Sequence, residues 1–143
     1  MAREAILTID CSLYSDSIAT IIKLFNEIGW VYTDNQMEYI PLNDNDMFVW
    51  VKEQLSFESL FSTIAQKQDA EELIGIALYH KDSNIGITIL TRNTKEINIS
   101  LNINKKKLDE QYTDVSWYVK NIIVMLEEMG CIIENYTFQE YIG

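Results

Sequence analysis

Residues 73–103, read as LIGIALYH, KDSN, IGITILT, RNTK and EINISLNI, decide the fold class. Three runs rich in Ile, Leu and Thr are separated by two four-residue segments of turn-forming and charged residues, a spacing that predicts three antiparallel strands joined by hairpins. In the last run apolar and polar side chains alternate strictly: Ile97, Ile99, Leu101 and Ile103 against Asn98, Ser100 and Asn102. Such alternation predicts a sheet with one buried face and one face in water.

Three amphipathic helices are expected around this sheet. The first covers residues 18–28, with N-capping side chains in residues 15–17 and Gly29 as its left-handed C-cap; the second begins at Ser56. The third begins near Asp114 and ends at Gly130. Further strands are predicted over residues 4–9, 30–33 and 131–138. The chain of 143 residues is therefore expected to form one domain, residues 1–143, of α+β class, with a mostly antiparallel sheet and about three helices packed on one face.

Two segments of the chain resemble each other. IIKLFNEIGWVY (residues 21–32) and IIVMLEEMGCII (residues 122–133) align without gaps, and a predicted strand precedes each. One interpretation is a weak duplication of a βαβ unit with a cleft between the halves. The other, which we favour, is that any amphipathic helix that ends at Gly before a strand has this pattern.

The composition restricts the partners that the chain can have. Eleven Lys and Arg against 22 Asp and Glu give a net charge of −11, so nucleic acid and anionic membranes are poor partners, whereas a basic protein would be attracted. No apolar run approaches the roughly 20 residues of a membrane span, and no signal peptide is evident. We expect a cytoplasmic protein in which the two cysteines stay reduced.

No set of residues typical of catalysis is present. His80 is the only histidine and ends a predicted strand, so it cannot form a His/Cys zinc site with two distant cysteines, and no glycine-rich nucleotide-binding motif occurs. We predict no enzyme, no catalytic residue, no cofactor and no metal. An enzyme of unfamiliar type would require His80 or clustered carboxylates to line a concavity.

The stretch EYIPLNDNDMFVWV, residues 38–51, contains four alternating Asn and Asp residues. A calcium loop that began at Asp44 would need Gly at its sixth position and Glu at its twelfth, where the chain has Val49 and Leu55. Asn and Asp tolerate left-handed backbone and are typical of turns. We therefore predict a hairpin with strands over residues 37–42 and 47–52.

The same region combines acids with aromatic residues. In a strand, Phe48 and Trp50 would share one face and Met47, Val49 and Val51 the other. If the aliphatic face is core, the aromatic face is open to a partner; the alternative is that Phe48 and Trp50 are core. The candidate partner-binding residues are Asp34, Glu38, Asp44, Asp46, Phe48, Trp50 and Glu53.

A small acidic α+β chain that carries a segment such as EYIPLNDNDMFVWVKE resembles the immunity proteins of bacterial polymorphic-toxin and contact-dependent inhibition systems. The resemblance implies an intracellular protein that binds and neutralises a cognate toxin domain, here a basic one. A small-molecule-binding or regulatory domain, with its ligand cleft between the two similar halves, is the alternative. A homodimer through an unpaired sheet edge also remains open.

Overall fold

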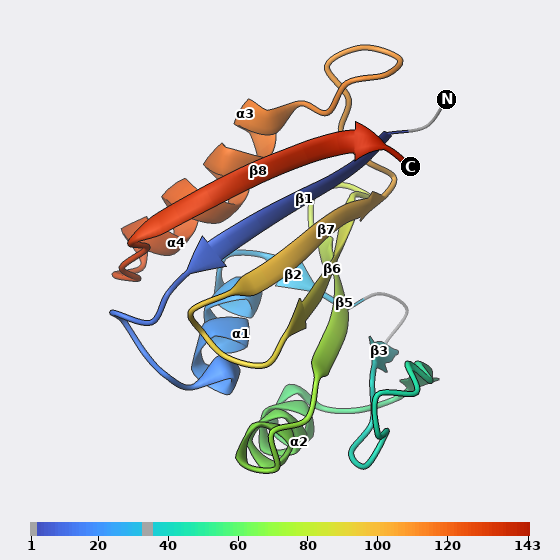
Figure 1. Ribbon diagram of the computed structural model, residues 1–143, viewed down its shortest axis with the longest axis vertical. Coiled ribbons are helices and arrows are strands. Elements are labelled where there is room, and N and C mark those ends of the chain that lie inside the picture. Colours follow the sequence, from blue (N-terminus) through green and yellow to red (C-terminus); the bar gives the residue numbers. More distant parts are fainter. Residues whose placement is uncertain (1–2, 33–35) are drawn as a thin grey trace.

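The computed structural model describes residues 3–32 and 36–143, which form one antiparallel eight-stranded sheet with helices on one face (Figure 1). The strand order is β4-β3-β5-β6-β7-β1-β8, and β2 pairs with β5 outside this path. The strands are β1 (Arg3–Asp10), β2 (Trp30–Val31), β3 (Met37–Tyr39), β4 (Val51–Glu53), β5 (Ile74–His80), β6 (Gly86–Thr91), β7 (Ile97–Ile103) and β8 (Asn135–Ile142). The predicted α+β class is confirmed.

The predicted meander of β5, β6 and β7 forms the centre of the sheet. Ile76 pairs with Ile89, and Ile89 pairs with Ile99. Leu7 of β1 continues this row opposite Ile99. All four side chains are almost completely buried, so the alternation in the sequence correctly predicts the face that carries the core.

The three predicted helices are also present. They are α1 (Ile18–Glu27), α2 (Phe57–Asp69) and a third helix built from α3 (Val115–Tyr118), a π-helical part η1 (Val119–Val124) and α4 (Met125–Glu128). Ser17, Ser56 and Asp114 cap them by accepting hydrogen bonds from backbone N–H groups of the first turn. Gly29 and Gly130 have φ of 106° and 96°, as expected of glycines just after a helix.

The buried Trp30 joins the third helix to the sheet. Its indole Nε1 donates to the carbonyl oxygen of Asn121 at 3.1 Å, within the π-helical part. Its ring also meets Trp117 edge-on, with 6.2 Å between centroids. In a π-helical part the backbone hydrogen bonds span five residues instead of four, so the pattern of carbonyls that are bonded within the helix changes. Here the Asn121 carbonyl accepts a hydrogen bond from the Trp30 side chain.

Some predicted boundaries were wrong. The closing strand is β8, which starts and ends four residues later than predicted: residues 131–134 form no strand, and the pairing with β1 begins at Asn135. The internal duplication is not confirmed: β8 has eight residues and pairs with β1, whereas β2 has two and pairs with β5. Of the strand predicted over residues 30–33, Trp30–Val31 form β2, residue 32 is not in a strand, and residue 33 lies outside the described residues.

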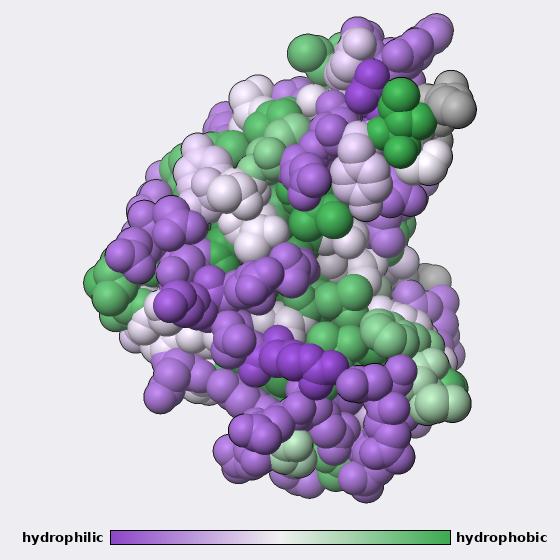
Figure 2. Space-filling view, viewed as in Figure 1, coloured by the Kyte–Doolittle hydropathy of each residue, from purple (hydrophilic) through white to green (hydrophobic). Residues whose placement is uncertain are grey.

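The second face of the sheet carries no helix and faces the viewer in Figures 1 and 2. Its cross-strand row runs from Glu38 through Ala77, Thr88 and Ser100 to Ile6. Of these five residues only Glu38, in β3, is charged. In Figure 2 hydrophilic residues cover much of this face, with smaller apolar patches between them. We call it the outer face.

Gly75 brings residues 40–50, hereafter the 40–50 segment, against the outer face. The Ile40 backbone N–H donates to the Gly75 carbonyl at 3.0 Å, and a Cβ at Gly75 would lie only 2.6 Å from Ile40 Cδ1. A larger residue would displace Ile40, which is 1% exposed. Because Gly75 has no side chain, Ile40 can pack directly against β5 where the chain continues from β3 into the 40–50 segment.

Candidate partner-binding site

The predicted hairpin is present, since β3 and β4 pair antiparallel, but its strands are shorter than predicted and the 40–50 segment between them is a loop with left-handed turns. The strands β3 and β4 are three residues each, and residues 47–50 pair with no strand. Asn43, Asn45 and Asp46 have φ between 57° and 65°, which Asn and Asp tolerate. The four alternating Asn and Asp residues therefore form turns, as predicted.

Phe48 has φ of 56°, which is unusual for a bulky side chain. The Asp44 carboxylate holds it there by accepting the backbone N–H of Phe48 at 2.8 Å and that of Val49 at 3.0 Å. Asp44 is thus committed to the loop's own backbone.

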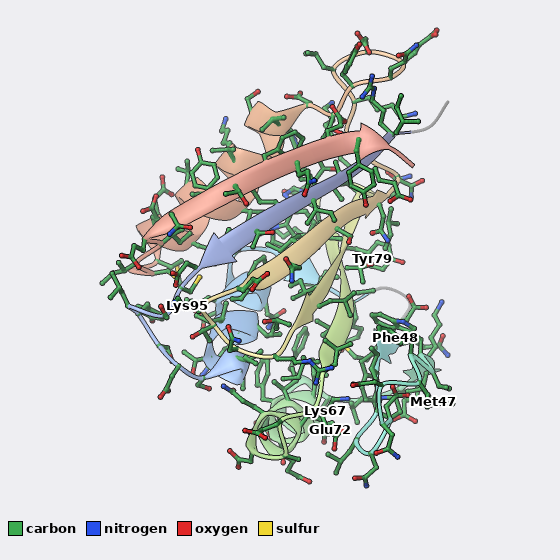
Figure 3. All side chains as sticks on the ribbon, in the orientation of Figure 1. Met47, Phe48, Lys67, Glu72, Tyr79 and Lys95 are labelled. Carbon is green, nitrogen blue, oxygen red and sulfur yellow. The ribbon has the colours of Figure 1, made fainter. Side chains whose placement is uncertain are left out.

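Lys67 and Glu72 fasten the 40–50 segment to the rest of the fold (Figure 3). Lys67 Nζ, on a side chain 1% exposed, donates to the carbonyls of Ile40 at 3.0 Å and Pro41 at 2.8 Å. Glu72 lies 3.6 Å from the same Nζ and accepts the backbone N–H of Asn43 at 2.8 Å. Burial lowers the pKa of Lys67, while the carboxylate of Glu72 acts in the opposite direction.

These anchors were not predicted from the sequence, because a lysine in the last turn of a helix is ordinarily on the surface. Arg92 adds a weaker contact from the end of β6, since its Nη2 lies 2.9 Å from Asp46 Oδ2. Both side chains of that pair are about half exposed, so the pair contributes little to stability.

The 40–50 segment exposes three consecutive apolar side chains, which we call the apolar tip: Met47 at 70%, Phe48 at 54% and Val49 at 57%. In Figure 3 Met47 and Phe48 lie at the margin of the molecule. The interpretation in which the aliphatic face is core fails for Met47 and Val49, because within the described residues no strand pairs with them and fixes their alternation. Phe48 is exposed as the open-face interpretation predicts, and of the expected aliphatic face only Val51 packs against the core.

The structure separates the other predicted partner-binding residues. Asp34 lies outside the described residues. Glu53 lies opposite Met37 in the β3–β4 pair, on the side of the sheet that carries the helices, and its carboxylate accepts a hydrogen bond from the Tyr39 hydroxyl. Burial, followed by this hydrogen bond, raises the pKa of Tyr39 to about 12. Glu53 is therefore engaged away from the outer face.

Glu38 and Trp50 meet on the outer face. A hollow of about 380 Å³ lies between them and strands β6 and β7; its lining residues are Glu38, Trp50, Thr88, Leu90, Ser100 and Asn102. The hollow adjoins the 40–50 segment, so these two residues and the apolar tip belong to one region of the surface.

A second hollow, of about 410 Å³, lies where β1 meets β7 and β8. The alternative prediction placed a ligand cleft between the two similar segments; this hollow is lined by β1 and β7, the strands that precede them, and by no residue of 21–32 or 122–133. Its walls include Arg3, Glu4 and Lys105, and Lys105 Nζ donates to the Arg3 carbonyl at 2.7 Å. The hollow is thus polar and charged, and not the deep apolar pocket that would favour a small-molecule site.

His80 ends β5 at the turn to β6, as predicted, and its half-buried ring lies among aromatic rings. Its ring centroid is 5.3 Å from that of Trp30 and 5.2 Å from that of Trp117, both edge-on. Within residues 3–32 and 36–143 its buried Nδ1 has no hydrogen-bond partner, and no three His, Cys, Asp or Glu side chains gather as a metal site would require. The contacts of the ring with Trp30 and Trp117 are packing contacts.

Comparisons with protein-family models, with curated proteins and with solved structures found no match to this chain. In the part of the chain that the structure describes, no helix is both long and apolar enough to cross a membrane.

Proposed function

We propose that this protein is an immunity-type inhibitor that binds a basic toxin domain through the apolar tip and the adjoining outer face. The proposal combines the resemblance of the sequence with the geometry of the 40–50 segment. Its apolar tip stands beside Asp44 and Asp46 on a chain whose net charge is −11. An apolar centre with charged surroundings is the arrangement that a protein interface requires.

The observation that carries the proposal is the conformation of Phe48. Holding a bulky residue at positive φ costs on the order of 1–3 kcal/mol, and the ring stays 54% exposed, so the free protein recovers little from burying it. Burial of such a ring in an interface would contribute about 1.5–3 kcal/mol. The strained loop thus presents a side chain whose apolar area becomes useful when a partner covers it.

The net charge supports a basic partner. A field of this sign accelerates the encounter with a positive protein and repels nucleic acid, and both effects weaken as salt rises. Inhibition then follows from occupation: a tightly bound acidic protein over the basic surface of a toxin domain excludes an anionic substrate.

The first experiment captures partners from the lysate and secretome of the source cell on the immobilised chain, with washes at low and then high salt. Each basic protein retained is then expressed in a test cell with and without this chain. We expect one of them to arrest growth when expressed alone and to be harmless in the presence of the chain.

Phe48→Asn tests the tip without damage to the fold. Asn adopts positive φ more readily than Phe, so the variant should keep or gain stability while its affinity for the captured protein falls about tenfold or more. Leu108→Asn is the matched control, because Leu108 is 73% exposed in the loop between β7 and α3. If Phe48→Asn protects growth as well as the wild type does, the assignment of the tip is refuted. If every captured protein is harmless when expressed alone, the immunity function is refuted.

A further inference from the structure

The hollow between Glu38 and Trp50 has an unusual distribution of charge. Among the described residues that line it, Glu38 alone is charged, and it belongs to β3 in the same cross-strand row as Thr88 and Ser100. The remaining lining is a tryptophan ring, one leucine, two hydroxyl groups and one amide. A single carboxylate therefore sits at one end of an otherwise neutral hollow.

Glu38 is not neutralised inside the fold. Within the described residues its carboxylate forms no hydrogen bond or ion pair, although exposed Lys52 is its cross-strand neighbour in β4. The other acids of this region are engaged: Asp44 with the loop backbone, Asp46 with Arg92 and Glu53 with a tyrosine. Of the predicted partner-binding acids that the structure describes, Glu38 is thus the one that remains available to a ligand beside an aromatic ring.

The hydroxyl groups of the hollow can accept hydrogen bonds. Thr88 Oγ1 donates its proton to Asn102 Oδ1 at 3.1 Å, which leaves the lone pairs of the threonine oxygen for a donor from outside. Ser100 has no side-chain hydrogen bond within the described part of the chain. Hydroxyl acceptors, the Trp50 ring and the Glu38 carboxylate thus line the same hollow.

We infer that this hollow receives one arginine side chain of the basic partner, an inference that rests on the proposed function. The guanidinium stacks on Trp50, pairs with Glu38 and donates its remaining N–H groups to the hydroxyls of Thr88 and Ser100. Arginine fits better than lysine because its planar group stacks on aromatic rings and carries five donors in a fixed fork. An anionic ligand is disfavoured by the same carboxylate.

The size of the hollow agrees with a side chain. About 380 Å³ is near the lower end of the range for ligand pockets, so it suits part of a larger molecule. The apolar tip lies on the same 40–50 segment that supplies Trp50. A partner that covers Phe48 can therefore insert an arginine beside it, which joins a desolvated apolar contact to a charged one.

The test is a nuclear magnetic resonance titration of the ¹⁵N-labelled chain in about 0.15 M NaCl. The probe is N-acetyl-L-arginine amide, and the matched probe is N-acetyl-L-citrulline amide, which keeps the planar end group but lacks its charge. We expect saturable shifts at the Trp50 indole and the backbone amides of Ser100 and Asn102 with arginine only. Glu38→Gln should raise the dissociation constant for the arginine probe about tenfold, and Trp50→Leu should raise it about threefold. Glu58→Gln, at an exposed position of α2, is the control and should leave this dissociation constant unchanged.

Equal shifts with both probes, or shifts spread over the acidic surface and unaffected by Glu38→Gln, would overturn the inference. Its failure is distinguishable from failure of the proposed function. A captured toxin whose binding depends on Phe48 but not on Glu38 leaves the inhibitor function standing and removes the arginine site. If arginine binding requires Glu38 but the chain protects no cell, the arginine site stands and the inhibitor function is removed.

Discussion

Replacing Lys67 by methionine tests how the 40–50 segment is held. Methionine has a similar length and fills the same space, but it removes the ammonium that donates to the carbonyls of Ile40 and Pro41. Hydrogen bonds from a charged donor contribute about 1.5–3 kcal/mol each. Lys67→Met removes two such hydrogen bonds. The loss is partly offset because the variant no longer buries a charge, and the cost of that burial is evident in the lowered pKa of Lys67.

The net loss in the free energy of unfolding should therefore be about 2–4 kcal/mol, which lowers Tm by roughly 6–12 °C in a domain of this size. Urea and thermal unfolding followed by circular dichroism measure it. If the 40–50 segment opens on its own while the sheet stays folded, the same free energy appears as local hydrogen exchange faster by a factor of about 30–1,000. The backbone N–H groups of Phe48 and Val49, which donate hydrogen bonds to the Asp44 carboxylate, report this opening.

Lys23→Met is the control, because Lys23 is an exposed lysine of α1. We expect it to change stability by no more than about 0.5 kcal/mol. The reasoning is refuted if Lys67→Met matches this control both in global unfolding and in the exchange of the two reporter amides. Such a result would mean that the remaining contacts, of Ile40 with Gly75, Asn43 with Glu72 and Asp46 with Arg92, are sufficient to hold the 40–50 segment in place.

Three further predictions concern ionisable groups. The raised pKa of Tyr39, about 12, means that the folded state retains a proton that the unfolded state loses near pH 10, so stability present below pH 10 is lost between about pH 10 and 12; Tyr39→Phe should abolish this loss in alkaline urea titrations. Hydrogen bonds from Ser12 lower the pKa of the Asp10 carboxyl, so its contribution is complete above about pH 4 and declines as pH falls through the folded-state pKa; acid unfolding curves of wild type and Asp10→Asn should converge in that range. Burial raises the pKa values of Cys11 and Cys131, so both thiols should react with Ellman's reagent only in urea, and rapid reaction of the native chain would contradict their burial.

Local patterns in the sequence predict most of the secondary structure correctly. The alternation of Ile97, Ile99 and Leu101 with polar residues sets the buried face of β7, because side chains of a strand point to opposite sides with a period of two. Ser17 and Gly29 mark the ends of α1 for equally local reasons, one as a hydrogen-bond acceptor and one through its freedom at positive φ. Such signals require only neighbouring residues.

The 40–50 segment shows where local patterns fail. Its alternation predicted a strand, yet Met47 and Val49 are exposed because no neighbouring strand pairs with them. The turn chemistry of its Asn and Asp residues was recognised correctly, since that chemistry acts within two or three residues. The left-handed conformation of Phe48 was not foreseen, because it depends on how Asp44 closes the loop.

The composition and local patterns of the sequence determined an acidic α+β chain, its meander, its helix ends and the turn at residues 43–46. Only the tertiary structure decided that Lys67 and Glu72 hold the 40–50 segment and that Glu38 and Trp50 share a hollow with Ser100. Those contacts join residues that are 12 to 62 positions apart in the chain. They depend on the order of strands in the sheet and on the close approach of Ile40 to Gly75, which no short window of sequence encodes.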